Sequence, residues 1–300
     1  MVDLTAESIG QLRDLRASSP GSIADLLLKR KRRPLLGADG RLFIVAADHP
    51  ARGSLGVRDN AMAMASRIDL LRRLVVALDR AGVDGVLGTP DIIEDLALLG
   101  ALDDKVVVGS MNRGGLRGST FEIDDRFTGY NVKTIVDGGL DFAKLLVRID
   151  LQDRATADTL ENTARAVTES AESRVPIMLE PFMSRRSDGL VVNDLSTEAV
   201  ITSIAIASGL GASSAYSWLK VPVVDDMERV IEASTLPTLL LGGDSDTSSD
   251  ETFASWQNAL TLPGVRGLVV GRSLLYPADD DVAAAVDTAA GLVHERVRAL

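Results

Sequence analysis

Short apolar runs alternate with longer amphipathic stretches along most of the chain. Runs such as LFIVAA and GLVVG are apolar at consecutive positions, which is typical of β-strands covered on both faces. Runs of this kind, bounded by Gly, Pro or Asp, predict eight strands, at residues 42–47, 82–87, 105–109, 142–149, 175–180, 215–220, 236–241 and 265–270. The regular alternation with helical patterns indicates repeated βα units around a parallel sheet.

The amphipathic stretches between these runs predict helices. Met62, Ile68 and Leu71 recur at helical spacing, and Asp153 and Ser196 stand where N-caps of two further helices are expected. The predicted helices cover residues 60–80, 153–173, 196–208, 225–234, 248–260 and 280–300. The first 35 residues form a predicted helical prefix, in which KRKRRP at 29–34 is expected to be a solvated turn.

Eight strands alternating with helices favour an α/β fold of the (β/α)8 TIM-barrel type. The alternative is an open, doubly wound sheet, which normally carries a Gly-rich fingerprint after its first strand. That position here reads DHPARGSLG, and neither the dinucleotide-binding nor the P-loop glycine pattern occurs in the chain. We therefore expect a single TIM-barrel domain over residues 1–300, with a helical prefix at 1–40 and the barrel at 41–300.

Composition narrows the possible partners and cofactors. The net charge of −11, from 43 acidic and 32 basic residues, argues against nucleic acid and anionic membranes as partners. Cysteine is absent and histidine occurs twice, which excludes thiol chemistry and a His-rich zinc site. The sequence has no signal-like start and no apolar run near the roughly 20 residues of a membrane span. We expect a cytoplasmic, metal-independent homo-oligomer without a cofactor.

Lys220 is the strongest candidate for chemistry. It ends the sixth predicted strand, and active sites of barrels lie at the carboxyl ends of their strands. Burial would lower the pKa of Lys220. Lys144 would supply a second cation nearby, because the fourth and sixth strands are both even-numbered and alternate strands contribute to the same interior layer of a barrel. The resulting free amine is a nucleophile for a ketone or an aldehyde. The alternatives are an ion pair that closes the barrel top and, for Lys144, a plain salt bridge with Glu180.

Two carboxyl groups stand at other predicted strand ends. Glu180 ends the fifth strand and could shuttle protons while a carbinolamine loses water, and Asp48 after the first strand could take a hydroxyl proton. Either carboxylate could instead cap the segment that follows it. His49 is a loop residue, a contact in the barrel mouth or a proton-transfer group. These residues place general acid–base chemistry beside Lys220.

An anion site is predicted at the ends of the last two strands. Barrels often hold phosphate there on backbone N–H groups, and glycines allow close approach. Arg272 adds a cation that can bind an anion through two N–H groups. Glycines are also common in ordinary turns, which is the alternative interpretation of this pattern. The candidate glycines are Gly242, Gly243 and Gly271. The long polar loop after the third strand is expected either to close over substrate, with Arg113 or Arg117 reaching in, or to be an ordinary surface loop.

Six segments carry a resemblance to a known family. They are DHPARG at 48–53, AKLLVR at 143–148, MLEPF at 178–182, WLKVPV at 218–223, LPTLLLGG at 236–243 and VVGRSLL at 269–275. In this order they resemble class I aldolases of the tagatose-bisphosphate and sulfofructose-phosphate type and, more distantly, deoxyribose-phosphate and archaeal-type fructose-bisphosphate aldolases. The resemblance implies a Schiff base on Lys220, assistance from Lys144, Glu180 and Asp48, and a phosphorylated sugar as substrate.

Two departures from the family pattern touch the barrel mouth. The chain has D-H-P where the tagatose-type enzymes resemble D-Q-R, and Arg272 stands where lysine is common. The chain also resembles actinobacterial aldolase-like proteins associated with inositol catabolism. That resemblance implies cleavage of 2-deoxy-5-keto-gluconate 6-phosphate to dihydroxyacetone phosphate and malonate semialdehyde. The alternatives are another sugar-phosphate aldolase, a thiolase-like enzyme or isomerase on the same scaffold, and a non-catalytic sugar-phosphate binding protein.

Overall fold

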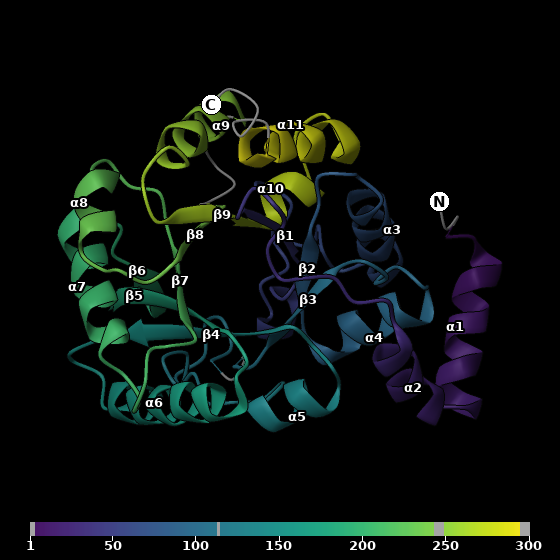
Figure 1. Cartoon of the computed structure of the whole chain (residues 1–300), viewed down its shortest axis with the longest axis horizontal. Coiled ribbons are helices and arrows are strands. Elements are labelled where there is room, and N and C mark those ends of the chain that lie inside the picture. Colours follow the sequence, from purple (N-terminus) through teal and green to yellow (C-terminus); the bar gives the residue numbers. More distant parts are fainter. Residues whose placement is uncertain (1–3, 113–114, 243–248, 295–300) are drawn as a thin grey trace.

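Parallel strands close into a barrel in the computed structural model, which describes residues 4–112, 115–242 and 249–294 (Figure 1). Around the barrel the strand order is β4-β3-β2-β1-β9-β8-β7-β5, and pairing of β5 with β4 completes the ring. The strands are β1 Leu42–Ala46, β2 Gly85–Gly88, β3 Val106–Ser110, β4 Phe142–Ile149, β5 Ile177–Ser187, β7 Ser217–Val221, β8 Thr238–Leu241 and β9 Val265–Val270. A short strand, β6 Leu190–Asn193, pairs antiparallel with the end of β5. The predicted (β/α)8 fold is confirmed.

Helices surround the barrel on its outside (Figure 1). They are α3 Arg67–Leu78, α4 Pro90–Leu98, α5 Val132–Asp137, α6 Ala155–Ser173, α7 Thr197–Ser208, α8 Met227–Glu232, α9 Ser249–Ala259, α10 Arg272–Leu275 and α11 Val282–His294. The prefix forms α1 Ala6–Ser18 and α2 Gly21–Lys29, and a 3-10 turn, η1 Pro50–Arg52, follows β1. Within the described ranges, no helix has the length and apolar character needed to cross a membrane.

Several predicted boundaries are wrong. The helix expected over 60–80 begins at Arg67, because the Ser66 side chain caps it by accepting the N–H of Asp69. The strand expected to end at Glu180 continues to Ser187, where it turns into the hairpin with β6. Helices α4 and α5 and strand β6 were not predicted, and each is short, with nine, six and four residues.

The expectation of a solvated turn at 29–34 is wrong for Arg30. This side chain is buried and pairs with Asp141 at 2.7 Å, while Arg33 pairs with Asp84. Asp84 also accepts the backbone N–H of Phe43 at 2.7 Å. The basic segment therefore lies across the amino-terminal end of the barrel, where carboxylates beside the strands bind it.

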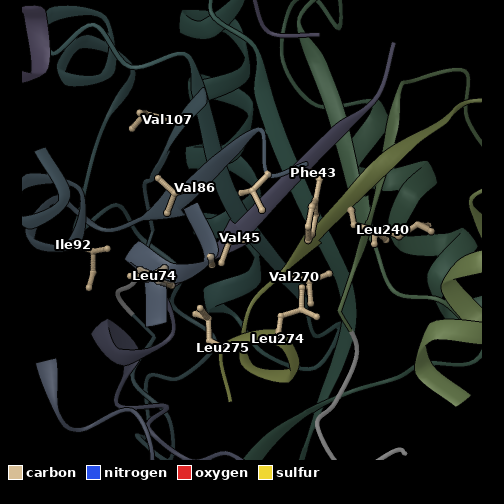
Figure 2. Packing of buried hydrophobic residues seen from close by; sticks show 14 of the residues in the cluster. Phe43, Val45, Leu74, Val86, Ile92, Val107, Leu240, Val270, Leu274 and Leu275 are labelled. Atoms are coloured by element: carbon tan, nitrogen blue, oxygen red, sulfur yellow. The ribbon is translucent and has the colours of Figure 1, made fainter. Parts of the chain in front are cut away.

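The apolar core has two layers that alternate along each strand. Figure 2 shows the outer layer, in which Val45, Val86 and Val107 lie on the strands and Leu74 and Ile92 come from α3 and α4. The inner layer fills the barrel with side chains from alternate positions, among them Leu42, Ile44, Ala46, Leu87, Val106, Val108, Phe142, Met178, Trp218, Leu239 and Val269. Leu35 and Leu36 from the prefix pack against this inner cluster. The barrel interior is thus filled below the mouth, which leaves the carboxyl ends of the strands for polar groups.

Candidate active site

The pleat of the strands explains why polar side chains gather in the barrel mouth. Successive side chains point to opposite faces, so a residue two positions beyond an inward-facing one also points inward. Each site residue follows a member of the inner apolar layer in this way, as Asp48 follows Ala46, Ser110 follows Val108, Lys144 follows Phe142, Glu180 follows Met178 and Lys220 follows Trp218. The same periodicity that fills the barrel therefore directs polar groups at one space from five strands or the residues that follow them.

Four ionisable side chains form a continuous chain of contacts. Lys220 Nζ donates to Glu180 Oε1 at 2.6 Å, and Lys144 Nζ contacts the other oxygen, Oε2, of the same carboxylate. Lys144 Nζ also donates to Asp48 Oδ2 at 3.3 Å. All four residues are buried, from 1% exposed for Lys144 to 8% for Glu180. The four predicted catalytic residues are thus brought together, with positive and negative groups alternating.

Glu180 is held as an anion by its two lysine partners. Burial by itself raises the pKa of the Glu180 carboxyl, but the ammonium groups of Lys144 and Lys220 outweigh burial and lower this pKa to about 2. The salt bridge between Lys144 and Glu180, which the sequence left open as an alternative, is present. Lys220 Nζ lies 2.6 Å from this carboxylate, and the expectation of an uncharged Lys220 stays a prediction.

Ser110 belongs to the same cluster and was not predicted. It lies at the end of β3, is fully buried, and its Oγ donates to Asp48 Oδ2 at 2.9 Å. Asp48 Oδ2 therefore accepts hydrogen bonds from both Ser110 and Lys144. The signal in the sequence is the position of Ser110, two residues after Val108 in VVVGS, but an uncharged serine at a strand end is not by itself distinctive.

His49 and Gly271 lie side by side next to the charged cluster. The Nδ1 atom of His49 is 3.9 Å from Asp48 Oδ1, and its side chain is a quarter exposed. Gly271 follows β9, and a Cβ there would overlap the carbonyl oxygen of Ala46 and lie 3.0 Å from His49 Cε1. Only glycine therefore fits at position 271.

The other predicted phosphate-binding residues are placed in part. Gly242 directly follows β8, and Arg272 begins α10 after Gly271, so both lie at the carboxyl ends of neighbouring strands. Gly243 and Arg113 lie outside the described residues. The structure thus brings together the ends of β8 and β9 but describes no complete anion site there.

Solved structures share this fold. The crystal structure of Cgl0159 from Corynebacterium glutamicum has 66% identity and a TM-score of 0.95, over 97% of this chain and 98% of that one. An archaeal fructose 1,6-bisphosphate aldolase has 20% identity and a TM-score of 0.67, over 91% and 99% of the two chains. A Schiff-base-forming fructose-1,6-bisphosphate aldolase has 19% identity and a TM-score of 0.63, over 91% and 100%. The two aldolases show a common barrel fold.

A search of curated proteins gives no match. The model of one protein family, described as Cgl0159-like, matches residues 40–290, which span the whole barrel and its mouth. The matched segment contains every residue of the charged cluster described above. The chain therefore belongs to the Cgl0159-like family.

Proposed function

We propose that this protein is a class I aldolase in which Lys220 forms a Schiff base with the ketone of a phosphorylated sugar or sugar acid. The observation that carries the proposal is the buried contact of Lys220 with Glu180, which Lys144 shares from its other side. Schiff-base aldolases need an amine nucleophile beside a group that can move protons. The barrel fold shared with fructose-bisphosphate aldolases, one of them Schiff-base-forming, supports the same chemistry.

Formation of the Schiff base would begin with loss of a proton from Lys220 to Glu180. The free Nζ then attacks the carbonyl carbon, and the N–C bond forms as a proton moves from the attacking nitrogen to the carbonyl oxygen to give a carbinolamine. Glu180, once protonated, returns its proton to the departing hydroxyl, which leaves as water. Because Lys144 binds the second oxygen of Glu180, it stabilises the anionic form from which the first transfer starts and to which the second returns.

Cleavage would use Asp48 as the base. Asp48 takes the proton of the hydroxyl group β to the iminium carbon, the C–C bond breaks, and its electron pair moves into the iminium to give an enamine. The aldehyde product leaves, a proton returns to the enamine carbon, and water releases the ketone product from Lys220. Ser110 and Lys144 both donate to Asp48 Oδ2 and so orient this base.

The phosphate would be held at the ends of β8 and β9. We assign Gly242, Gly271 and Arg272 to this role, together with Gly243 and Arg113, which lie outside the described residues. The absence of a side chain at Gly271, where a Cβ would overlap a neighbouring backbone oxygen, supports close backbone packing at this edge. Within this class, 2-deoxy-5-keto-gluconate 6-phosphate is the substrate we propose, on the resemblance to the aldolase-like proteins of inositol catabolism.

Reductive trapping tests the proposal directly. The protein is incubated with this sugar acid phosphate, or with dihydroxyacetone phosphate, in the presence of borohydride, and the modified peptide is identified by mass spectrometry. We expect a reduced adduct on Lys220 and none in Lys220→Met. Lys105→Met is a matched control, because Lys105 is a lysine whose pKa is lowered by burial but which lies outside the mouth and donates to the Val83 carbonyl.

The outcomes of trapping separate the candidate functions. An adduct that persists in Lys220→Met, or one that disappears in Lys105→Met, contradicts the assignment of the nucleophile. Binding of the sugar phosphate without any adduct, and with unchanged affinity in Lys220→Met, favours the non-catalytic binding protein instead.

A further inference from the structure

A second buried charge cluster lies above the catalytic lysines on one side of the mouth. Strands β4 and β5 stay paired as far as Ile149 and Met183, beyond the point where β5 leaves β7 at Leu179. Arg148 stands four residues after Lys144 on β4 and shares its face. This part of the barrel therefore extends about 13 Å beyond Lys144 along the strand.

Arg148 binds two carboxylates from the loop that follows β3. Its guanidinium makes a two-pronged contact with Asp125, with Nε at 2.9 Å from Oδ2 and Nη2 at 2.7 Å from Oδ1. It also donates to the Glu122 carbonyl oxygen and lies 3.5 Å from Glu122 Oε1. The exposed fractions are 2% for Arg148, 1% for Asp125 and 3% for Glu122. Two-pronged arginine–carboxylate pairs hold their partners in one geometry.

Glu122 extends this attachment to the hairpin of β5 and β6. Its Oε2 accepts the backbone N–H of Gly118 at 2.9 Å, within the loop, and the N–H of Val191 on β6 at 3.3 Å. Gly115 is packed so closely that a Cβ there would overlap the Glu122 carbonyl oxygen and the Arg148 guanidinium. The loop, the end of β4 and β6 are therefore joined through one arginine and two carboxylates.

We propose that Arg148 is a positioning residue that fastens residues 115–125 as a preformed wall of the substrate pocket. Opening this wall would separate a buried guanidinium from both of its carboxylates, and an unpaired buried charge is strongly disfavoured. The wall is therefore in place before substrate arrives, and it limits where a sugar phosphate can lie relative to Lys220. The expected effect of this wall on substrate binding and turnover rests on the proposed aldolase function. The presence of the wall before substrate binds does not depend on that function.

Hydrogen–deuterium exchange of the unliganded protein tests the preformed wall first. We expect the peptides that contain Gly118 and Val191 to exchange slowly without ligand, and to slow by less than about threefold when dihydroxyacetone phosphate is added. Rapid exchange without ligand, followed by strong protection with it, would show a closing lid and would overturn the proposal. This measurement needs no variant and no turnover.

Variants then test the role of Arg148 in positioning. In Arg148→Met we expect exchange of peptide 115–125 to rise at least roughly tenfold, while the peptide of β1 is unchanged. KM should rise roughly tenfold with little change in kcat. The substitution alters the wall that positions the substrate, whereas Lys220 and the residues that contact it are unchanged. Arg148→Lys should recover part of both effects. Glu122→Gln, which removes a charge at nearly constant shape, serves if Arg148→Met does not fold.

Arg165→Met is the matched control. It removes an arginine–carboxylate contact of 2.9 Å with Glu161, but on the exposed face of α6. We expect no change in exchange of residues 115–125 and no change in KM. Equal effects of Arg148→Met and Arg165→Met, or unaltered exchange and KM in both Arg148→Met and Glu122→Gln, would refute the positioning role. If the wild-type protein traps no sugar phosphate on Lys220, the aldolase proposal fails while the exchange result still decides this one.

Discussion

At the scale of single residues, hydrogen bonds to one oxygen of Asp48 connect the proposed base to the lysine pair. Ser110 Oγ and Lys144 Nζ both lie within hydrogen-bond distance of Oδ2. Ser110 therefore helps to hold the Asp48 carboxylate in place for the proposed cleavage step.

Replacement of this serine tests that role. In Ser110→Ala we expect kcat/KM to fall roughly tenfold, because one of the donors that hold the Asp48 carboxylate is lost. The measurement is the rate of cleavage of the substrate whose trapping labels Lys220. Ser203→Ala is the control, since Ser203 is also fully buried but its Oγ donates to the Val200 carbonyl on α7. An equal fall of kcat/KM in both variants would show that loss of a buried hydroxyl, rather than of the contact with Asp48, is responsible.

At the scale of elements, His294 attaches the last helix to the amino-terminal end of the barrel. Its Nδ1 lies 2.6 Å from Asp39 Oδ2, and its Nε2 lies 3.2 Å from Asp84 Oδ2. The hydrogen bond with Asp84, together with Asp39 and against the effect of burial, raises the pKa of His294 to about 9. Asp84 in turn pairs with Arg33 from the prefix. Helix α11, the start of β2 and the prefix are thus joined by charged groups.

This attachment predicts a pH-dependent stability. Because the pKa of His294 is raised from 6.5 to about 9, its stabilising contribution is complete below pH 6.5 and is lost as the pH rises through 9. The free energy of unfolding of the wild type should exceed that of His294→Gln. We expect this difference to be about 2 kcal/mol larger at pH 6 than at pH 10. Urea titrations of both proteins across this range measure the difference. A gap that does not change with pH would contradict a charged His294.

At the scale of the whole molecule, the prefix closes the end of the barrel opposite the proposed active site. Leu35 and Leu36 pack against the inner apolar layer, and Arg30 pairs with Asp141 beside β4. Asp141 also accepts the backbone N–H of Val107 at 2.8 Å, so this carboxylate links the prefix to two neighbouring strands. Stability of the barrel is therefore expected to depend on residues that precede its first strand.

Adjacent basic residues of the prefix allow a direct comparison. Arg30→Met should lower the free energy of unfolding by about 2–4 kcal/mol, because it removes the buried partner of Asp141. Lys29→Met should change it by less than about 0.5 kcal/mol, because the pair of Lys29 with Asp25 is largely exposed. Urea unfolding measures both. Similar losses in the two variants would show that the buried pair is not what holds the prefix.

The amino-acid sequence by itself determined the barrel and four of the residues directed into its mouth. Apolar runs with β periodicity placed Lys220, Lys144, Glu180 and Asp48 at or near strand ends, and the carboxyl ends of parallel strands meet at one edge. Short elements such as β6 were not predicted, because they depend on the neighbours against which they pack.

Only the tertiary structure decided which groups touch. The tilt and stagger of strands in a barrel set how far apart strand ends lie, and no local pattern encodes that offset. For this reason periodicity did not predict three contacts. They are the sharing of Glu180 by Lys144 and Lys220, the contact of Ser110 with Asp48, and the pairing of Arg148 with a loop more than 20 residues before it. Long-range hydrogen bonds and ion pairs become visible only when the closed ring fixes their distances.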